Sequence, residues 1–337
     1  MNIFFKKKII IGIHGLGNKP SKALLEKWWK NALFEGLSVF GKTVSDFNFE
    51  LVYWADILHP EPQDFNITDE DNPLYLDHHY VKASDYTVKP LNKTRQKFLD
   101  YLEKAMDDLF LNDDLTINFS KMTDKILHKY FKDLDAYYNS FMFNPSKTNN
   151  NARQRIRKRL IDCLRKHRNK DILLISHSMG TIIAFDVLSQ HPNDFQIDTF
   201  VTMGSPLGIP VVKGKIAAEL SKMRIPTPFL KAPENIIRNW YNLSDLEDRI
   251  AINYNLADDY EPNSRGIDAV DKIISNNYSY NGEANPHSSY GYLRTPEMVR
   301  IIEDFIEYDH QPVVKWMDKK LNRISEIYRK LIQKNKV

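Results

Sequence analysis

Short apolar runs alternate with amphipathic stretches along most of the chain. Residues 8–13, KIIIGI, form a β-branched run that predicts a buried strand. Residues 22–37 repeat apolar side chains at three- and four-residue steps, which is typical of an amphipathic helix, and Ser21 is placed to cap it. Residues 49–56, FELVYWAD, predict the next strand. Strand, helix and strand at this spacing predict a βαβ unit with parallel strands, because such crossovers are right-handed.

Further β-rich runs extend this pattern towards the C-terminus. They cover residues 171–176, 197–205, 235–245 and 270–279. A helix is predicted after Thr295, where Pro296 and Glu297 occupy the first turn. Alternating strands and helices predict an α/β fold with a mostly parallel sheet flanked by helices.

Three segments depart from this alternation. Residues 57–150 run from an acidic, proline-bearing loop into helical segments, which predicts a helical insertion that caps one end of the sheet. Residues 207–234 form a second lid-like excursion, because long structureless loops are uncommon in compact domains unless they act as lids. Residues 313–337 predict a C-terminal amphipathic helix. We expect residues 1–337 to form one domain that carries these additions.

Composition narrows the function classes. The 47 Lys and Arg against 44 Asp and Glu give a net charge of +3, which does not indicate a nucleic-acid partner. No stretch approaches the roughly 20 apolar residues that cross a bilayer, so we expect a soluble protein. The one cysteine, Cys163, excludes an intramolecular disulfide and a structural cysteine-based zinc site, and it fits a cytoplasmic location. Its neighbours predict a small core residue.

The stretch DILLISHSMGTIIAFDVL, residues 171–188, runs from an apolar strand through a tight turn into an apolar helix. A serine needs exposure, an adjacent base and donors for the oxyanion to act as a nucleophile. A strand-to-helix turn exposes the apex residue, here Ser178, and needs small residues two positions away, here Ser176 and Gly180. Ser176 lies at the strand end and is not the predicted nucleophile.

This turn resembles the nucleophile elbow of the α/β-hydrolase superfamily, Gly-x-Ser-x-Gly, with Ser176 in place of the first glycine. The resemblance implies an α/β-hydrolase-like fold and an acyl-enzyme formed on Ser178. It covers the sheet-forming parts of the chain and leaves residues 57–150 unmatched.

The segment IGIHGLGN, residues 11–18, is similar to the family's strand and glycine turn that supply part of the oxyanion hole. The resemblance implies that the Leu16 and Met179 amides bind the oxyanion, with Gly15 and Gly17 allowing the backbone to approach. An ordinary strand-to-helix turn is the alternative. The segment matches neither glycine-rich phosphate motif.

The family order is serine, acid and histidine, which implies that His287, in NGEANPHSSYGYL, is the base. The acid follows the strand at 235–245. Asp248 is preferred, because DRIA resembles the family's acid loop, and Asp245 is the alternative. The acid would hold the imidazole in the correct tautomer.

Other histidines have different predicted roles. His177 is expected to support the elbow, and His14 to bond backbone groups at its loop. His78 and His79 follow an acidic loop that is more often solvated than metal-binding, so no metal and no organic cofactor is predicted. The basic segment 153–170 could contact phosphates or anionic lipid, but its apolar stripe favours a helix with a solvated outer face.

The sequence therefore predicts a lipase- or carboxylesterase-like serine hydrolase that cleaves a small-molecule or lipid ester or thioester. Membrane contact is possible but not favoured. A catalytically silent hydrolase-fold protein that binds a lipid or a protein partner is the alternative.

Overall fold

The computed structural model describes residues 7–42, 47–76, 78–84, 86, 92–97, 99, 137, 152–222, 230–251 and 253–308. The chain divides into the units Met1–Ile302 and Glu303–Val337. The described residues of the second unit are 303–308, which include the end of helix α8 (Pro296–Glu307). The predicted helix at 313–337 lies outside the described residues. No helix in the described ranges has the length and apolar character that crossing a membrane requires.

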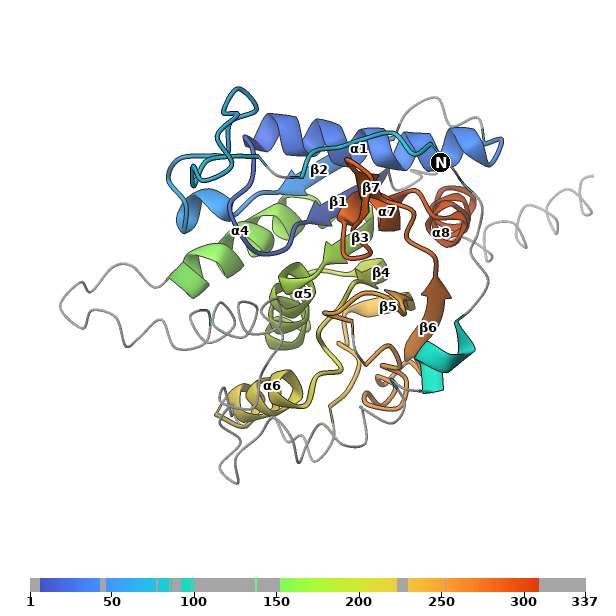
Figure 1. The fold of residues 1–337 in the computed structure, drawn as a ribbon. Helices are drawn as coiled ribbons and strands as arrows, with labels where there is room; N and C mark the ends of the chain where they lie inside the picture. Colours follow the sequence, from blue (N-terminus) through green and yellow to red (C-terminus); the bar gives the residue numbers. More distant parts are fainter. Residues whose placement is uncertain are drawn as a thin grey trace, which may run out of the picture. The chain divides into compact units, whose positions relative to one another are not determined.

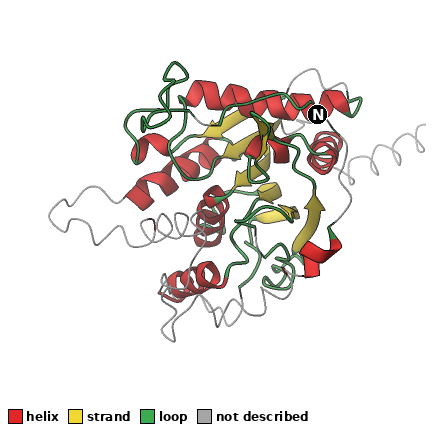
Figure 2. Cartoon of the chain, in the orientation of Figure 1, coloured by secondary structure: helices red, strands yellow, loops and turns green. Residues whose placement is uncertain are grey.

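The first unit contains a six-stranded parallel sheet, which confirms the predicted α/β fold (Figures 1 and 2). Its spatial order is β2-β1-β3-β4-β5-β6. The strands are β1 (Lys8–Ile13), β2 (Phe49–Val52), β3 (Asp171–His177), β4 (Ile197–Met203), β5 (Ile236–Asp245) and β6 (Ala269–Ile274). A hairpin of β7 (Ser279–Tyr280) and β8 (Glu283–Ala284) lies outside this sheet.

Helices pack on both faces of the sheet. The helices are α1 (Lys22–Val39), α4 (Ala152–Lys166), α5 (Met179–Gln190), α6 (Pro210–Lys222) and α7 (Ser289–Leu293), with a 3₁₀ turn η1 (Ala55–Ile57). Side chains of α4, α5 and α6 form one core with Ile9, Ile11 and Ile13 of β1. On the opposite face α1 packs so tightly that a Cβ at Gly12 would lie 2.9 Å from the Trp29 ring. Burying such apolar surface stabilises the fold.

The strand ends differ from the predicted ones for identifiable reasons. Residues 53–56 were predicted to continue β2, but the Trp54 amide donates to His14 Nε2 at 3.0 Å and the chain enters η1. Residues 275–279 were predicted to continue β6, but the Asn276 amide donates to the Asp245 carboxylate at 2.6 Å. At both points the backbone amide donates to a side chain instead of to a backbone carbonyl of the neighbouring strand.

The predicted additions are described in part. Most of 57–150 lies outside the described residues, so the helical lid stays a prediction. Its segment 78–84 is tied to α1, because Tyr80 Oη and the Ala83 amide donate to Glu35 at 2.7 and 2.8 Å. The first half of 207–234 is the core helix α6, and residues 223–229 lie outside the described part. Ser21 occupies the N-cap position of α1 without a capping side-chain hydrogen bond.

Candidate active site

Ser178 lies between the buried strand β3 and helix α5, with a backbone φ of 54° and ψ of −128°. A positive φ costs energy in a residue with a Cβ, and such strain concentrates at functional sites. The close crossing requires Gly180, because a Cβ there would lie 2.7 Å from the carbonyl oxygens of Ile13 and His14. Ser176 is fully buried and donates to the Val201 carbonyl, so its hydroxyl is engaged elsewhere.

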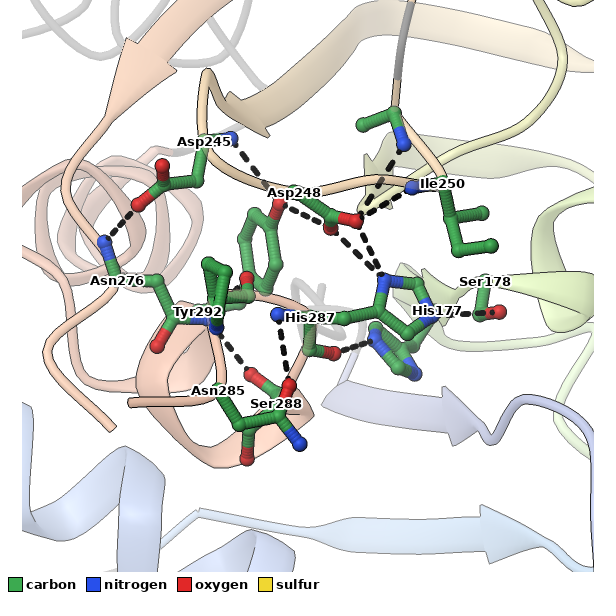
Figure 3. A network of polar contacts seen from close by, with 12 residues as sticks. His177, Ser178, Asp245, Asp248, Ile250, Asn276, Asn285, His287, Ser288 and Tyr292 are labelled. Carbon is green, nitrogen blue, oxygen red and sulfur yellow. Dashed lines mark hydrogen bonds and ion pairs between the residues drawn. The ribbon is translucent and has the colours of Figure 1, made fainter. Parts of the chain in front are cut away.

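His287 reaches this turn from the loop between β8 and α7 (Figure 3). Its Nε2 lies 3.0 Å from Ser178 Oγ, and its Nδ1 lies 2.8 Å from Asp248 Oδ2. Both backbone polar groups of His287 are also fixed. Its N–H donates to Asn285 Oδ1 at 3.0 Å, and its carbonyl accepts from His177 Nε2 at 2.8 Å. Hydrogen bonds to the backbone N–H and carbonyl of His287 therefore hold this residue in place, in addition to those made by its ring.

Asp248, in the loop after β5, is fully buried. Its carboxylate accepts the Ile250 amide at 2.8 Å and the Tyr292 hydroxyl at 2.8 Å, in addition to His287 Nδ1. These donors compensate for the loss of water around a buried charge. The structure thus brings together Ser178, His287 and Asp248 in one hydrogen-bonded chain.

Asp245, the alternative acid, points to other partners (Figure 3). Its carboxylate accepts the amides of Asn276 and Glu247 at 2.6 and 2.8 Å. Burial raises the pKa of Asp245 above its ordinary value, although both amide bonds act in the opposite direction. Asn276 in turn donates to the carbonyls of Pro286 and Ser288, at 2.9 Å each. Asp245 therefore helps to hold the backbone on either side of His287.

The predicted oxyanion loop lies against the serine. A Cβ at Gly15 would lie 2.7 Å from Ser178 Cβ, and Gly17 has a φ of 82° that favours glycine. Neither the Leu16 nor the Met179 amide donates a hydrogen bond to another backbone group in the described part of the chain. The backbone of the predicted oxyanion loop at Gly15 is thus in close contact with the turn that carries Ser178.

His14 and His177 are buried, and burial lowers the pKa of both rings, that of His14 from 6.5 to about 3. His14 Nε2 accepts the Trp54 amide, so its Nδ1–H donates to the Gly15 carbonyl at 2.8 Å. This is the backbone-bonding position expected from the sequence. His177 lies beside Ser178 in sequence, but its Nε2 bonds the His287 carbonyl instead of the serine hydroxyl.

A cavity of about 270 Å³ opens onto the serine. Ser178 and His287 contribute to its wall together with Leu16 of the predicted oxyanion loop. Leu25 and Trp29 of α1 add apolar surface. A group in this cavity would lie beside the serine, the imidazole and the Gly15–Gly17 backbone together.

One cluster among the described residues has a composition compatible with a metal ion. Glu50, Cys163 and His167 each bring a potential ligand atom within 4.8 Å of the others. Burial raises the pKa of the Cys163 thiol to about 12, and the Lys166 ammonium donates to the Glu50 carboxylate at 2.8 Å. Metal binding needs a thiolate and a free carboxylate, so these contacts favour a hydrogen-bonded cluster.

The basic helix α4 is bound to the body of the protein through its charged side chains. Arg153 is 9% exposed and pairs with Asp186 of α5 at 2.9 Å. Further pairs within the unit are Arg159–Asp56, Arg165–Asp194 and Lys166–Glu50. Part of the α4 face that was expected to be solvated therefore forms ion pairs with neighbouring elements.

Three residues at the site were not singled out from the sequence. Tyr292 bonds Asp248, and Asn276 holds the loop around His287. Gly204 has a φ of 54°, and a Cβ there would lie 2.9 Å from Asp248 Oδ2. No local motif marks these residues, because each acts through a partner that is distant in sequence.

Comparisons with known proteins cover different parts of the chain. A crystal structure of an uncharacterized protein from Bacillus cereus ATCC 10987 aligns with 12% identity and a TM-score of 0.32, over 91% of this chain and 61% of that chain. No curated protein matches. Residues 146–213, which contain the elbow, match the family model of lecithin:cholesterol acyltransferase.

Proposed function

We propose that the protein is a serine enzyme that transfers the acyl group of a carboxylic ester or thioester through an acyl-enzyme on Ser178. The observation that carries the proposal is the hydrogen-bonded chain from Asp248 through His287 to Ser178 at a strained turn. The match of residues 146–213 to an acyltransferase family supports acyl chemistry at this turn.

In the first half-reaction Ser178 Oγ attacks the ester carbonyl carbon and passes its proton to His287 Nε2. Asp248 holds Nδ1–H and stabilises the imidazolium that forms. The Leu16 and Met179 amides donate hydrogen bonds to the negatively charged former carbonyl oxygen, and the N-terminus of α5 stabilises its charge. His287 then returns the proton to the leaving alcohol or thiol, which leaves an ester on Ser178.

In the second half-reaction His287 Nε2 removes a proton from the group that attacks the acyl carbon. The bond from this carbon to Ser178 Oγ then breaks, and His287 returns the proton to Oγ. If water attacks, the product is a free acid and the enzyme is a lipase- or carboxylesterase-like hydrolase. If an alcohol attacks, the acyl group is transferred.

Hydrolysis is the primary proposal, and lipid esters are the favoured substrate class because the matched family acts on lecithin and cholesterol. A cytoplasmic location is part of the proposal.

Hydrolysis of a series of p-nitrophenyl esters and acyl thioesters tests the proposal. We expect turnover by the wild type and a loss of about a millionfold in Ser178→Ala, as in other serine enzymes. Turnover that persists in Ser178→Ala would refute the assigned nucleophile. If the wild type turns over no ester or thioester but binds lipid or a protein partner, it is a catalytically silent binding protein.

A further inference from the structure

Tyr292 contacts the acid of the proposed triad from helix α7 (Figure 3). Its hydroxyl donates to Asp248 Oδ2 at 2.8 Å and accepts the Asp245 amide at 3.0 Å. The side chain is fully buried. Because α7 directly follows the loop that carries His287, Tyr292 links this loop to the end of β5.

We propose that Tyr292 is a positioning residue for the reaction, and this inference rests on the proposed function. Its hydroxyl orients the Asp248 carboxylate so that Oδ2 meets His287 Nδ1–H. The imidazole is thereby kept in the tautomer whose Nε2 can accept the proton of Ser178.

The two oxygens of Asp248 share one donor and differ in their others. His287 Nδ1 lies 2.8 Å from Oδ2 and 3.0 Å from Oδ1. Oδ1 accepts the Ile250 amide at 2.8 Å and the Ala251 amide at 3.4 Å. Oδ2 accepts from Tyr292 and from His287, at 2.8 Å each. The terminal torsion of an aspartate is soft and turns both oxygens together, so the donors around them fix the plane of the carboxylate. Tyr292 adds a side-chain donor at Oδ2 that holds this plane towards His287.

The direction of the hydroxyl proton follows from its partners. An N–H of Asp245 occupies a lone pair of the Tyr292 oxygen, so the hydroxyl proton points to its other partner, Asp248 Oδ2. Burial and the charge of Asp248 raise the pKa of Tyr292 well above its ordinary value. The hydroxyl therefore stays protonated and remains a donor.

The surroundings leave little room for a substitute donor. The backbone of Gly204 lies so close that a Cβ there would be 2.9 Å from Asp248 Oδ2 and 3.2 Å from His287 Nδ1. A side chain at this position is sterically excluded. Removing the Tyr292 hydroxyl would therefore leave Oδ2 with His287 as its donor within the described residues.

Tyr292→Phe tests the inference, because it removes one oxygen and keeps the ring. Tyr260→Phe is the matched control, since Tyr260 is also buried and donates a single hydrogen bond, to the Leu207 carbonyl at 2.9 Å. Ester turnover is measured per folded molecule, with the folded fraction taken from circular dichroism. Proton NMR follows the downfield His287 Nδ1–H signal, identified by its loss in His287→Gln.

We expect kcat of Tyr292→Phe to fall about tenfold with KM unchanged, the pattern of an interaction that acts in the transition state. The Nδ1–H signal should shift in Tyr292→Phe and stay in place in Tyr260→Phe. A kcat within about twofold of the wild type, or an equal loss in both variants, would overturn the inference. If the wild type lacks Ser178-dependent turnover, the proposed function fails. An unmoved NMR signal in Tyr292→Phe separately overturns the positioning of the Asp248–His287 pair.

Discussion

Asp248→Asn changes the proposed acid while conserving its shape. Oδ1 faces the Ile250 amide at 2.8 Å, so an asparagine keeps its carbonyl oxygen there and places its NH₂ group at the position of Oδ2. That NH₂ group then faces His287 Nδ1, which lies 2.8 Å from Oδ2. A donor at this position stabilises the imidazole tautomer with its proton on Nε2, which cannot accept the proton of Ser178.

The expected loss in kcat is about 10⁴-fold, as for the same change in a serine-protease triad. At about 1.36 kcal/mol for each factor of ten, this raises the activation free energy by roughly 5 kcal/mol. The asparagine oxygen retains the Ile250 amide bond, whereas the Tyr292 hydroxyl loses its acceptor at Oδ2, so the free energy of unfolding should fall by about 1–3 kcal/mol. The variant should therefore be folded and nearly inactive.

Initial rates of p-nitrophenyl butyrate hydrolysis measure this loss, with Asp245→Asn as the control. Asp245 accepts amides of Asn276 and Glu247, and losing one such bond costs about 1–3 kcal/mol. Even if all of that cost appeared in the transition state, the control would lose less than about two hundredfold. A larger loss in Asp245→Asn than in Asp248→Asn would refute the assignment of the acid.

Three further changes test the fold around the site. Gly180→Ala should lower the free energy of unfolding by about 1–3 kcal/mol in urea titrations, because its Cβ would lie 2.7 Å from the Ile13 carbonyl oxygen; unchanged stability would contradict the close crossing. Arg294→Met should lower the free energy of unfolding by about 3–5 kcal/mol, because it leaves buried Glu35 without the guanidinium that lies 3.1 Å away. A decrease below about 1 kcal/mol would argue against a buried pair. Between pH 6.5 and about 3 the unfolded chain binds a proton at His14 that the folded chain does not, so the free energy of unfolding should fall as pH decreases through this window. In His14→Gln that pH dependence should be weaker, and an unchanged slope would contradict the lowered pKa.

Much of the fold could be predicted because the strands of a parallel sheet are continuously apolar. The run at 171–176 became β3 with every residue buried, and the run at 8–13 became β1. The ends of β2 and β6 could not be predicted in the same way. They depend on hydrogen bonds from the Trp54 and Asn276 amides to side chains that are distant in sequence.

The candidate site also contains residues that local sequence could identify and residues that it could not. Ser178 could be found locally, because strand, tight turn and helix are adjacent in the sequence. The choice between Asp248 and Asp245 depended on a loop resemblance, whereas the structure distinguishes them by the direction of each carboxylate. Tyr292 was not found, because a buried tyrosine near a predicted helix start has no pattern that separates a hydrogen-bond donor from a core residue.

Reaction with a fluorophosphonate, followed by intact-mass and peptide mass spectrometry, tests most directly whether Ser178 is an activated nucleophile. We expect one adduct on the wild-type chain, located at Ser178, and no adduct on Ser178→Ala. An adduct at another residue, or one that persists in Ser178→Ala, would contradict the assignment of Ser178 as the nucleophile.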